Sequence, residues 1–186
     1  HCDTEVLLVA WQQWGYACLE RLNGMFSFVI VDHKQQKIYA ARDRLGIKPL
    51  FWHFDNGNFL AASELKAILP SDLSLSQLDK GAIHDYFSLG YVPEPKSIYK
   101  DYFKLPAGHT LELCVKLMTS PVIKQYWNCL DYLSGHDANN TSQVRVGKEL
   151  LEDSVKKRMI ADVPVGAFLS GGLDSSAITS IMRKHS

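Results

Sequence analysis

The dipeptide Asn56-Gly57 constrains the possible folds of this chain more than any other feature. It lies between two short apolar segments, Leu50–Phe54 and Phe59–Ser63. Asn-Gly between such segments predicts a tight hairpin, because both turn residues need a positive φ that Asn and Gly tolerate best. The middle of the chain is therefore expected to hold antiparallel strands joined by short turns.

The segments around this hairpin have helix and strand patterns. Apolar residues at helical spacing predict a helix that follows an Asp3-Thr4 cap and ends at Gly15. A shorter helix is expected at Ala17–Leu22, before Asn23-Gly24. The other expected elements are a buried strand at Met25–Asp32, strands at Lys37–Asp43, His109–Val115 and Pro121–Trp127, and a helix at Leu78–Leu89.

The character of the chain changes after Trp127. Residues 128–142 are polar and rich in turn formers, which indicates a linker. A helix is expected from about Gln143 to Ile160, then a buried strand at Val163–Ser170 and a second helix from Ser175 to about Lys184. The predicted fold class is α+β, followed by the start of an α/β unit.

Composition excludes several classes of function. The 20 basic and 20 acidic side chains cancel, which argues against a nucleic-acid or anionic membrane partner. No apolar run approaches the length of a membrane span. The 4 cysteines show no CxxC or CxxxC spacing, so we expect reduced thiols in a cytoplasmic protein.

The stretch "GAFLSGGLDSSAITS", residues 166–180, has the pattern of a phosphate site. A strand, a glycine turn and a helix N-terminus together present free backbone N–H groups and the positive end of a helix dipole. Gly171 and Gly172 allow close approach of an anion, and the hydroxyls of Ser170, Ser175 and Ser176 can donate to its oxygens. The spacing is not that of the common P-loop, because no lysine follows the glycines.

Asp174 would repel a phosphate unless a cation lay between them. Mg²⁺ is commonly held by one or two carboxylates together with substrate phosphates, so Asp174 is a candidate magnesium ligand. The alternative is a tight turn in which Asp174-Ser175 caps the helix and no ligand binds.

The loop "SGGLDSS" resembles the pyrophosphate-binding loop of ATP pyrophosphatases, whose pattern is SGGxDS. The preceding "KKRMIADVPVGAFL" is similar to one branch of that group, the glutamine-hydrolysing asparagine synthetases. The segments "DTEVLL", "RLNGMFSFVIVD", "ARDRLGIKPLF", "ASELKAIL", "GYVPEPKSIYKDYFKLPAGH" and "QYW" resemble the second half of the glutaminase domain of these enzymes, in the same order. Only Asn128–Ser142 resembles nothing in the family.

The resemblance implies an organisation. Residues 1–127 would be the C-terminal part of a class II glutamine amidotransferase domain, 128–142 a linker, and 143–186 the start of an asparagine synthase domain. The expected folds are a partial αββα N-terminal-nucleophile sandwich, then the first strand and helices of a doubly wound parallel-sheet domain. We therefore expect an internal fragment, inactive by itself, of a parent enzyme that is often a homodimer in this family.

The resemblance also implies a mechanism. Glutamine-derived ammonia would amidate an aspartate carboxylate that Mg-ATP activates as an acyl-adenylate, with release of pyrophosphate and AMP. Ser170, Gly171, Gly172, Asp174, Ser175 and Ser176 would hold the phosphates, with magnesium on Asp174. The backbone around Phe168 and Leu169 would lie against the adenine, and Leu173 would pack inward.

Asp3 corresponds by resemblance to the group that binds the α-amino group of glutamine; the plainer interpretation is a helix cap. Cys2 is not expected to be the N-terminal nucleophile of such glutaminases, because it directly precedes the "DTE" helix. The nucleophile is expected upstream of His1. The catalytic synthetase groups beyond the loop are expected downstream of Ser186.

Other polar segments are expected to be structural. Arg42-Asp43-Arg44 favours structural pairing, and Ser63-Glu64 the end of a strand and the start of a short helix, with a place near the glutamine pocket as the sharper alternative. Lys156–Arg158 is expected to be a solvated helix face.

Two alternatives to asparagine synthesis stay open. One is a related amide-forming enzyme with another acceptor, like β-lactam synthetases or peptide cyclases. The other is a non-catalytic homologue, which would be expected to have lost Asp174 or the glycine pair.

Overall fold

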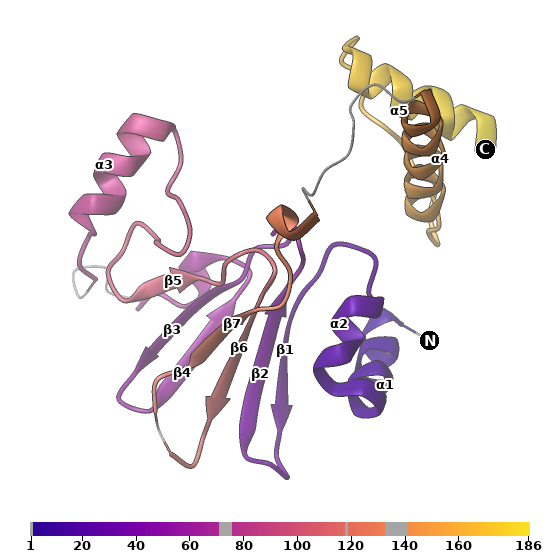
Figure 1. Ribbon diagram of the computed structural model, residues 1–186. Helices are drawn as coiled ribbons and strands as arrows, with labels where there is room; N and C mark the ends of the chain where they lie inside the picture. The colour runs from indigo at the N-terminus through magenta and orange to yellow at the C-terminus, as the bar shows by residue number, and fades with distance from the viewer. Residues whose placement is uncertain (1, 71–75, 118, 133–140) are drawn as a thin grey trace. The chain divides into compact units, whose positions relative to one another are not determined.

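The computed structural model describes residues 2–70, 76–117, 119–132 and 141–186. The chain divides into two compact units, His1–Tyr132 and Leu133–Ser186. Figure 1 labels the elements of both units.

The first unit contains two antiparallel sheets. One has the strand order β1-β2-β6-β7 and the other the order β4-β3-β5. The strands are β1 Ser27–Asp32, β2 Lys37–Arg42, β3 Phe51–Asp55, β4 Asn58–Ala62, β5 Tyr102–Lys104, β6 His109–Cys114 and β7 Val122–Gln125. The helices are α1 Asp3–Trp14, α2 Cys18–Arg21 and α3 Lys80–Leu89, with short 3₁₀ turns at Gly15–Ala17, Leu65–Ala67 and Cys129–Tyr132.

The predicted hairpin is confirmed. Asp55 of β3 pairs with Asn58 of β4, and the two residues between them have the positive φ values that such a turn needs, 49° at Asn56 and 80° at Gly57. The helix expected at Leu78–Leu89 is also confirmed, as α3, Lys80–Leu89. The Asp79 carboxylate caps α3 by accepting the N–H groups of Gly81 and Ala82.

Strand β2 places apolar side chains on both faces of the larger sheet. Ala40 contributes to a core with Leu50, Leu105, Leu111 and Leu113, so this core lies between the two sheets. Its neighbour Ala41 points to the other face and packs with Ala10, Cys18 and Leu19 from the α1–α2 region. Successive residues of a strand face opposite sides of its sheet. One face of β2 therefore packs against the helices α1 and α2, and the other face packs against the smaller sheet.

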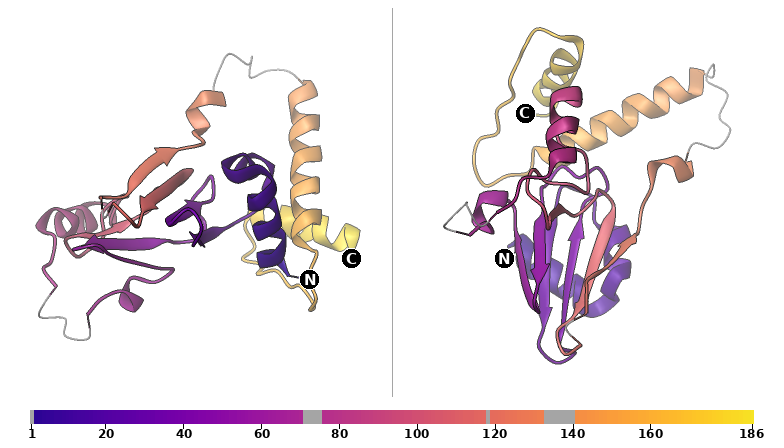
Figure 2. Two further views of the ribbon diagram at one scale, coloured as in Figure 1. Left: turned by 90° about the horizontal axis from the view of Figure 1, so that it is seen from below. Right: turned by 90° about the vertical axis from the view of Figure 1, so that its left-hand side faces the viewer.

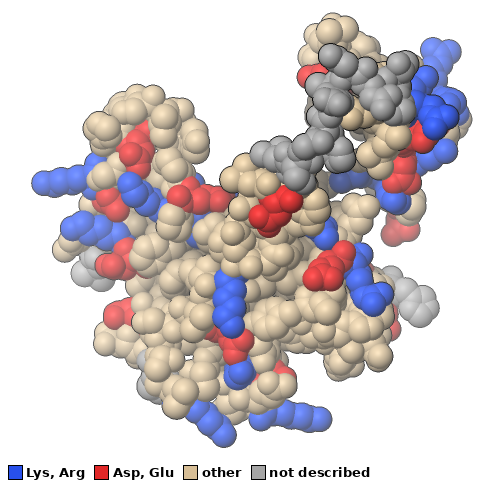
Figure 3. All heavy atoms as spheres, in the orientation of Figure 1, with Lys and Arg blue, Asp and Glu red and all other residues tan. Residues whose placement is uncertain are grey.

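Figures 1 and 2 show this arrangement in the first unit, with α1 and α2 beside the larger sheet and α3 at the opposite end, near β5. Figure 3 shows acidic and basic side chains interspersed over the face of the first unit in view. The mixed α/β architecture with antiparallel sheets agrees with the predicted class for this half of the chain.

The expectation that Met25–Asp32 is buried throughout is wrong. Strand β1 lies at the edge of its sheet, and Val29 and Val31 are exposed. These two residues pair with Ala40 and Ile38, whose side chains face the smaller sheet. The smaller sheet has three strands and the larger sheet has four. The exposure of Val29 and Val31 indicates that the smaller sheet does not cover this part of β1.

The second unit contains α4 Thr141–Arg158 and α5 Leu173–His185. Helix α4 begins two residues earlier than expected, and α5 includes Leu173 and Asp174 as well. The predicted buried strand Val163–Ser170 is wrong: the segment has no regular structure, and Val163, Val165 and Leu169 are exposed. A strand of a parallel sheet is stable when neighbouring strands and helices cover it, and the described part of this unit has no strand.

Most of the predicted linker, residues 133–140, lies outside the described residues. Lys156–Arg158 is exposed, as expected, with Lys157 paired to Asp153 one helical turn earlier.

Candidate functional site

A cavity of about 550 Å³ lies in the first unit between the start of α1 and strand β1. We call it the Asp3 cavity. Its lining residues are Asp3, Thr4, Leu7, Leu8, Leu22, Asn23, Gly24, Met25, Phe26, Ser27, Phe28, Val29, Ile30, Lys48 and Ser63. Among these, only Asp3 and Lys48 carry formal charges, so the walls are mostly apolar with one acidic and one basic group.

Asp3 is the first residue of α1 rather than its cap. Cys2 holds the N-cap position and makes no side-chain capping bond. The Oδ1 atom of Asp3 accepts the N–H of Thr4 at 2.8 Å. A carboxylate offers about four acceptor sites, so this bond leaves capacity for a ligand in the cavity.

Ser63 follows β4 and precedes the 3₁₀ turn Leu65–Ala67, so the structural prediction for Ser63-Glu64 is confirmed. Ser63 also lines the Asp3 cavity.

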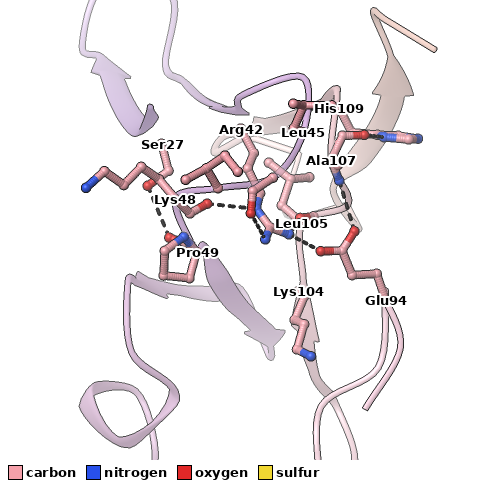
Figure 4. Close-up of polar contacts among 12 residues, drawn as sticks. Ser27, Arg42, Leu45, Lys48, Pro49, Glu94, Lys104, Leu105, Ala107 and His109 are labelled. Carbon is pink, nitrogen blue, oxygen red and sulfur yellow. Dashed lines mark hydrogen bonds and ion pairs between the residues drawn. The ribbon is translucent and has the colours of Figure 1, made fainter. Parts of the chain in front are cut away.

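The segment Arg42-Asp43-Arg44 is structural, as predicted. The guanidinium of Arg42 is buried and donates to the carbonyl oxygens of Lys48, Gly46 and Leu105, and it pairs with Glu94 (Figure 4). The Asp43 carboxylate, also buried, accepts four backbone N–H groups. Charges are buried at acceptable cost when they are paired or fully hydrogen-bonded: Arg42 is paired with Glu94, and Asp43 is held by backbone N–H groups.

Tyr126 adds one more contact to this segment. Its hydroxyl donates to the Arg42 carbonyl oxygen at 2.8 Å. Burial raises the pKa of Tyr126 to about 12, so the phenol stays neutral and keeps its donor at physiological pH.

The second candidate site is the loop Ser170–Ser176 in the other unit. Gly171 has a φ of 82°, and Gly172 is the N-cap residue of α5. The hydroxyls of Ser170 and Ser175 lie 3.0 Å apart, and Ser175 also donates to the Gly172 carbonyl oxygen at 3.1 Å. The glycines therefore form the turn, and two of the three predicted serines meet beside it.

The start of α5 offers free donors. The Ser176 N–H bonds to the Gly172 carbonyl oxygen, and no side chain caps the helix. The preceding N–H groups of Leu173, Asp174 and Ser175 therefore have no intrahelical partner. An α5 of 13 residues also carries a helix dipole, whose positive end lies at this loop.

Three predicted residues of this region lie at the surface. Asp174 is exposed in the first turn of α5, which rules out the simple N-cap interpretation for it. Phe168 is fully exposed, at 101% of its reference area. Leu173 is 91% exposed, so the prediction that it packs inward is wrong within this unit.

The donor set at the loop fits a magnesium–phosphate ligand. It combines one carboxylate, serine hydroxyls and free N–H groups, and Mg²⁺ typically takes one or two carboxylates with phosphate oxygens. No group of three or more His, Cys, Asp or Glu side chains forms a metal site within the described ranges. Asp174 is a single carboxylate, so it would hold a metal ion only if a phosphate supplied further ligands.

Sequence reasoning missed Lys48, and with it the cavity formed by the first turn of α1, strand β1 and the β2–β3 turn. Lys48 is far along the chain from Asp3, and a turn lysine is ordinarily a solvated side chain. Lys48 lies in the segment Gly46–Pro49, whose glycine and proline favour a turn after the strand, but this pattern does not point to a cavity.

All four cysteines are free thiols, and Cys2 and Cys129 are exposed. Burial raises the pKa of the Cys18 thiol, which keeps it in its unreactive protonated form. Across the described ranges, no helix has both the length and the apolar character needed to cross a membrane.

The sequence matches two known protein families, in separate parts of the chain. Residues 1–127 match the family described as "Glutamine amidotransferase domain", and residues 147–186 match the family described as "Asparagine synthase". The first match covers most of the chain and the whole of the Asp3 cavity, so the class is that of glutamine amidotransferases. With the second match, the chain belongs to the glutamine-hydrolysing asparagine synthetase family.

Three relatives are similar over nearly the whole chain. A Methanocaldococcus jannaschii protein named "Putative asparagine synthetase [glutamine-hydrolyzing] 2" is 43% identical over 185 residues, 98% of this chain and 35% of the relative. Bacillus subtilis "Asparagine synthetase [glutamine-hydrolyzing] 3" is 38% identical over 98% of this chain and 29% of the relative. Penicillium rubens "Amidase chyE" is 32% identical over 97% of this chain and 26% of the relative. The chain thus spans about a third or less of these relatives.

Proposed function

We propose that this protein is a glutamine-hydrolysing asparagine synthase, an ATP-dependent carbon–nitrogen ligase with glutamine as amide donor. The observation that carries the proposal is the order of the two family matches, each with a candidate site inside it. The Asp3 cavity lies within the first match, and the Ser170–Ser176 loop lies within the second. We also propose the domain limits 1–127 and 143–186, with a linker between them.

In the first half, we propose that Asp3 binds the α-ammonium group of glutamine. The exposed Asp3 carboxylate lines a cavity with largely apolar walls, and its hydrogen bond to an ammonium group would be charge-assisted, which makes it shorter and stronger than a neutral one. The Asp3 position at the start of α1 agrees with this role, and no described residue is proposed as the nucleophile that attacks glutamine.

In the second half, we propose that the loop binds ATP. Ser170, Gly171, Gly172, Ser175 and Ser176 would hold the phosphates through hydroxyl and backbone N–H donors at the start of α5. The backbone of Phe168 and Leu169 would lie along the adenine. Asp174 would hold Mg²⁺, which supplies positive charge to the departing pyrophosphate when it is bound.

The proposed chemistry has two parts. A carboxylate oxygen of aspartate attacks the α-phosphorus of ATP. The bond between this phosphorus and the oxygen that bridges to the β-phosphate breaks, and pyrophosphate leaves. Ammonia from glutamine then attacks the acyl-adenylate carbon, AMP leaves, and asparagine remains. The donors at the start of α5 are fixed before pyrophosphate forms, so they stabilise its charge without reorganising.

A second candidate function is amide formation on another acceptor. It is supported by the similarity to a relative named as an amidase rather than an asparagine synthetase. The acceptor is not among the ligands proposed for either site, so both functions share the chemistry proposed above and differ only in the carboxylate that ATP activates.

The family resemblance also leads us to propose a homodimer in the cytoplasm that acts on small molecules only. Light scattering on the protein in its full natural length tests the assembly directly, with a monomer at working concentration as the contradicting result.

The test of function uses the same full-length protein with Mg-ATP and ammonia, with and without aspartate. Pyrophosphate release is followed together with asparagine by mass spectrometry. The proposal predicts aspartate-dependent pyrophosphate with matching asparagine. Turnover with another acceptor but not with aspartate would support the second function, and ATP binding without any turnover would contradict both.

A further inference from the structure

Asp43 is a buried carboxylate, 2% exposed, in a protein whose other acidic residues lie mostly at the surface. It accepts the backbone N–H groups of Phe26 (3.3 Å), Leu45 (3.2 Å), Ile47 (3.0 Å) and Lys48 (2.9 Å). A charge at such a depth is costly unless its acceptor sites are filled, and here neutral backbone donors fill them.

Two of these donors belong to walls of the Asp3 cavity. Phe26 and Lys48 both line it, and they come from different parts of the chain, the entry to β1 and the turn after β2. Phe26 is held twice, because its carbonyl oxygen also accepts the Asp43 N–H at 2.8 Å. The carboxylate thus fixes two separate wall segments relative to one another.

The neighbours of Asp43 hold the same walls. Arg44 donates to the carbonyl oxygen of Leu22, a third lining residue, at 2.7 Å. Arg42 donates to the carbonyl oxygen of Lys48 at 2.8 Å, as Figure 4 shows, so the backbone of Lys48 is bound on both sides. The hydroxyl of Ser27 bonds to the Pro49 carbonyl oxygen at 3.1 Å and joins the two segments again.

We infer that Asp43 is a positioning residue of the proposed glutamine site, acting through the backbones of Phe26 and Lys48. This inference rests on the proposed function, because it takes the Asp3 cavity as the place where glutamine binds. A substrate held in a reactive geometry is sensitive to small displacements of the walls around it. Asp43 touches no substrate, so its effect reaches the reaction only through the shape of the cavity.

The test compares Asp43→Asn with Glu94→Gln in the full-length protein. Asn keeps the size of the side chain but replaces one acceptor oxygen by an NH₂ group, which cannot accept an N–H. Glu94 is a matched control, because its carboxylate likewise accepts a backbone N–H, that of Ala107 at 3.0 Å, and in addition it pairs with Arg42. Neither Glu94 nor Ala107 lines the Asp3 cavity.

Three quantities are measured: the KM for glutamine, ammonia-dependent asparagine formation, and hydrogen exchange of backbone amides. Asp43→Asn is expected to raise the KM for glutamine about tenfold, the size of effect typical of losing a hydrogen bond to a charged group. Ammonia-dependent synthesis is expected to stay unchanged. Exchange should accelerate at Phe26 and Lys48 in this variant, and at Ala107 in Glu94→Gln, whose KM stays at the wild-type value.

Three outcomes would overturn the inference. One is an unchanged KM in Asp43→Asn, and another is an equal rise of KM in Glu94→Gln. The third is a parallel loss of glutamine-dependent and ammonia-dependent rates, which marks general unfolding. A wild-type protein that hydrolyses no glutamine would instead contradict the proposed function. In that case the exchange data still decide whether Asp43 holds the cavity walls.

Discussion

The two candidate sites each depend on a glycine turn, and the two turns are built in opposite ways. Gly46 has a φ of 65°, and a Cβ added there would lie 3.0 Å from Ala107 Cβ and from the Arg42 guanidinium. Gly171 has a φ of 82°, and an added Cβ would meet nothing within 4 Å. Protein atoms therefore surround the first glycine closely, while the space around the second glycine is empty of protein atoms in the part of the chain that the structure describes.

The polar groups of the two turns differ in the same way. In the first turn, the side chains of Arg42 and Asp43 bond to backbone groups and bury the charge. In the second, the N–H groups at the start of α5 have no cap, and Asp174 is exposed. The first turn has its backbone N–H groups bonded within the protein, so it can hold the walls of a site in place but cannot bind the ligand. The second turn leaves backbone N–H groups free, so it is suited to bind the ligand directly.

The largest expected effect is that of Asp174→Asn on the open turn. If Asp174 holds Mg²⁺ beside the departing pyrophosphate, asparagine formation falls about 100-fold or more, with either ammonia or glutamine as the nitrogen source. Glutamine hydrolysis without ATP stays at the wild-type rate, and this measurement is the control. A variant that keeps its synthetase rate would contradict the role of the loop.

The next effect is that of Asp3→Asn on the cavity supported by the enclosed turn. Loss of a charge-assisted hydrogen bond to the glutamine ammonium is expected to raise the KM for glutamine about 10- to 100-fold. Ammonia-dependent asparagine formation is the internal control and should not change. If both rates fell together, Asp3 would be a structural residue of α1 only.

A pair of alanine variants tests the contrast between the two glycines in stability. Gly46→Ala is expected to lower the free energy of unfolding of the first unit by more than the ~1–2 kcal/mol cost of a left-handed residue, because the buried Arg42 must also move. Gly171→Ala should cost its unit no more than about that amount. Urea denaturation gives both values, and equal effects would remove the distinction.

The smallest effect concerns pH in the second unit. Glu152 of α4 bonds to Lys184 and His185 of α5, which lower its pKa from the usual value to about 2. Its pKa is depressed on folding, so its contribution to helix packing is complete above pH 4.5 and is lost as the pH falls toward 2. Helical content measured by circular dichroism should fall over this range in the wild type.

The matched variant is Glu152→Gln, which has no carboxylate to titrate at this position. Its helical content should vary less with pH across the same range. Identical pH profiles of the two proteins would show that the ion pairs between α4 and α5 contribute nothing measurable, as is common for exposed pairs.

Features with local causes were predicted from the sequence. The hairpin at Asn56-Gly57, the end of the strand at Ser63 and the glycine turn before α5 each depend on residues within a few positions. The pairing role of Arg42-Asp43-Arg44 was also predicted, because charged residues at a strand end commonly bind the backbone of the following turn.

Features that depend on distant parts of the chain were not predicted. The segment Val163–Ser170 is apolar enough for a buried strand, but a parallel strand depends on partners elsewhere in the chain. The exposure of Val29 depends on how far the smaller sheet extends. The place of Lys48 in the Asp3 cavity depends on the bonds from Phe26 to Asp43 and from Ser27 of β1 to Pro49, which join segments remote in sequence, and no local pattern predicts them.

The central claim is that one protein joins a glutamine site to an ATP-dependent synthetase site. The most direct measurement supplies the full-length protein with Mg-ATP, aspartate and glutamine labelled with ¹⁵N at its amide, and follows asparagine by mass spectrometry. The account predicts ¹⁵N-labelled asparagine formed together with equal amounts of glutamate and AMP. Glutamate and AMP released without labelled asparagine would contradict it.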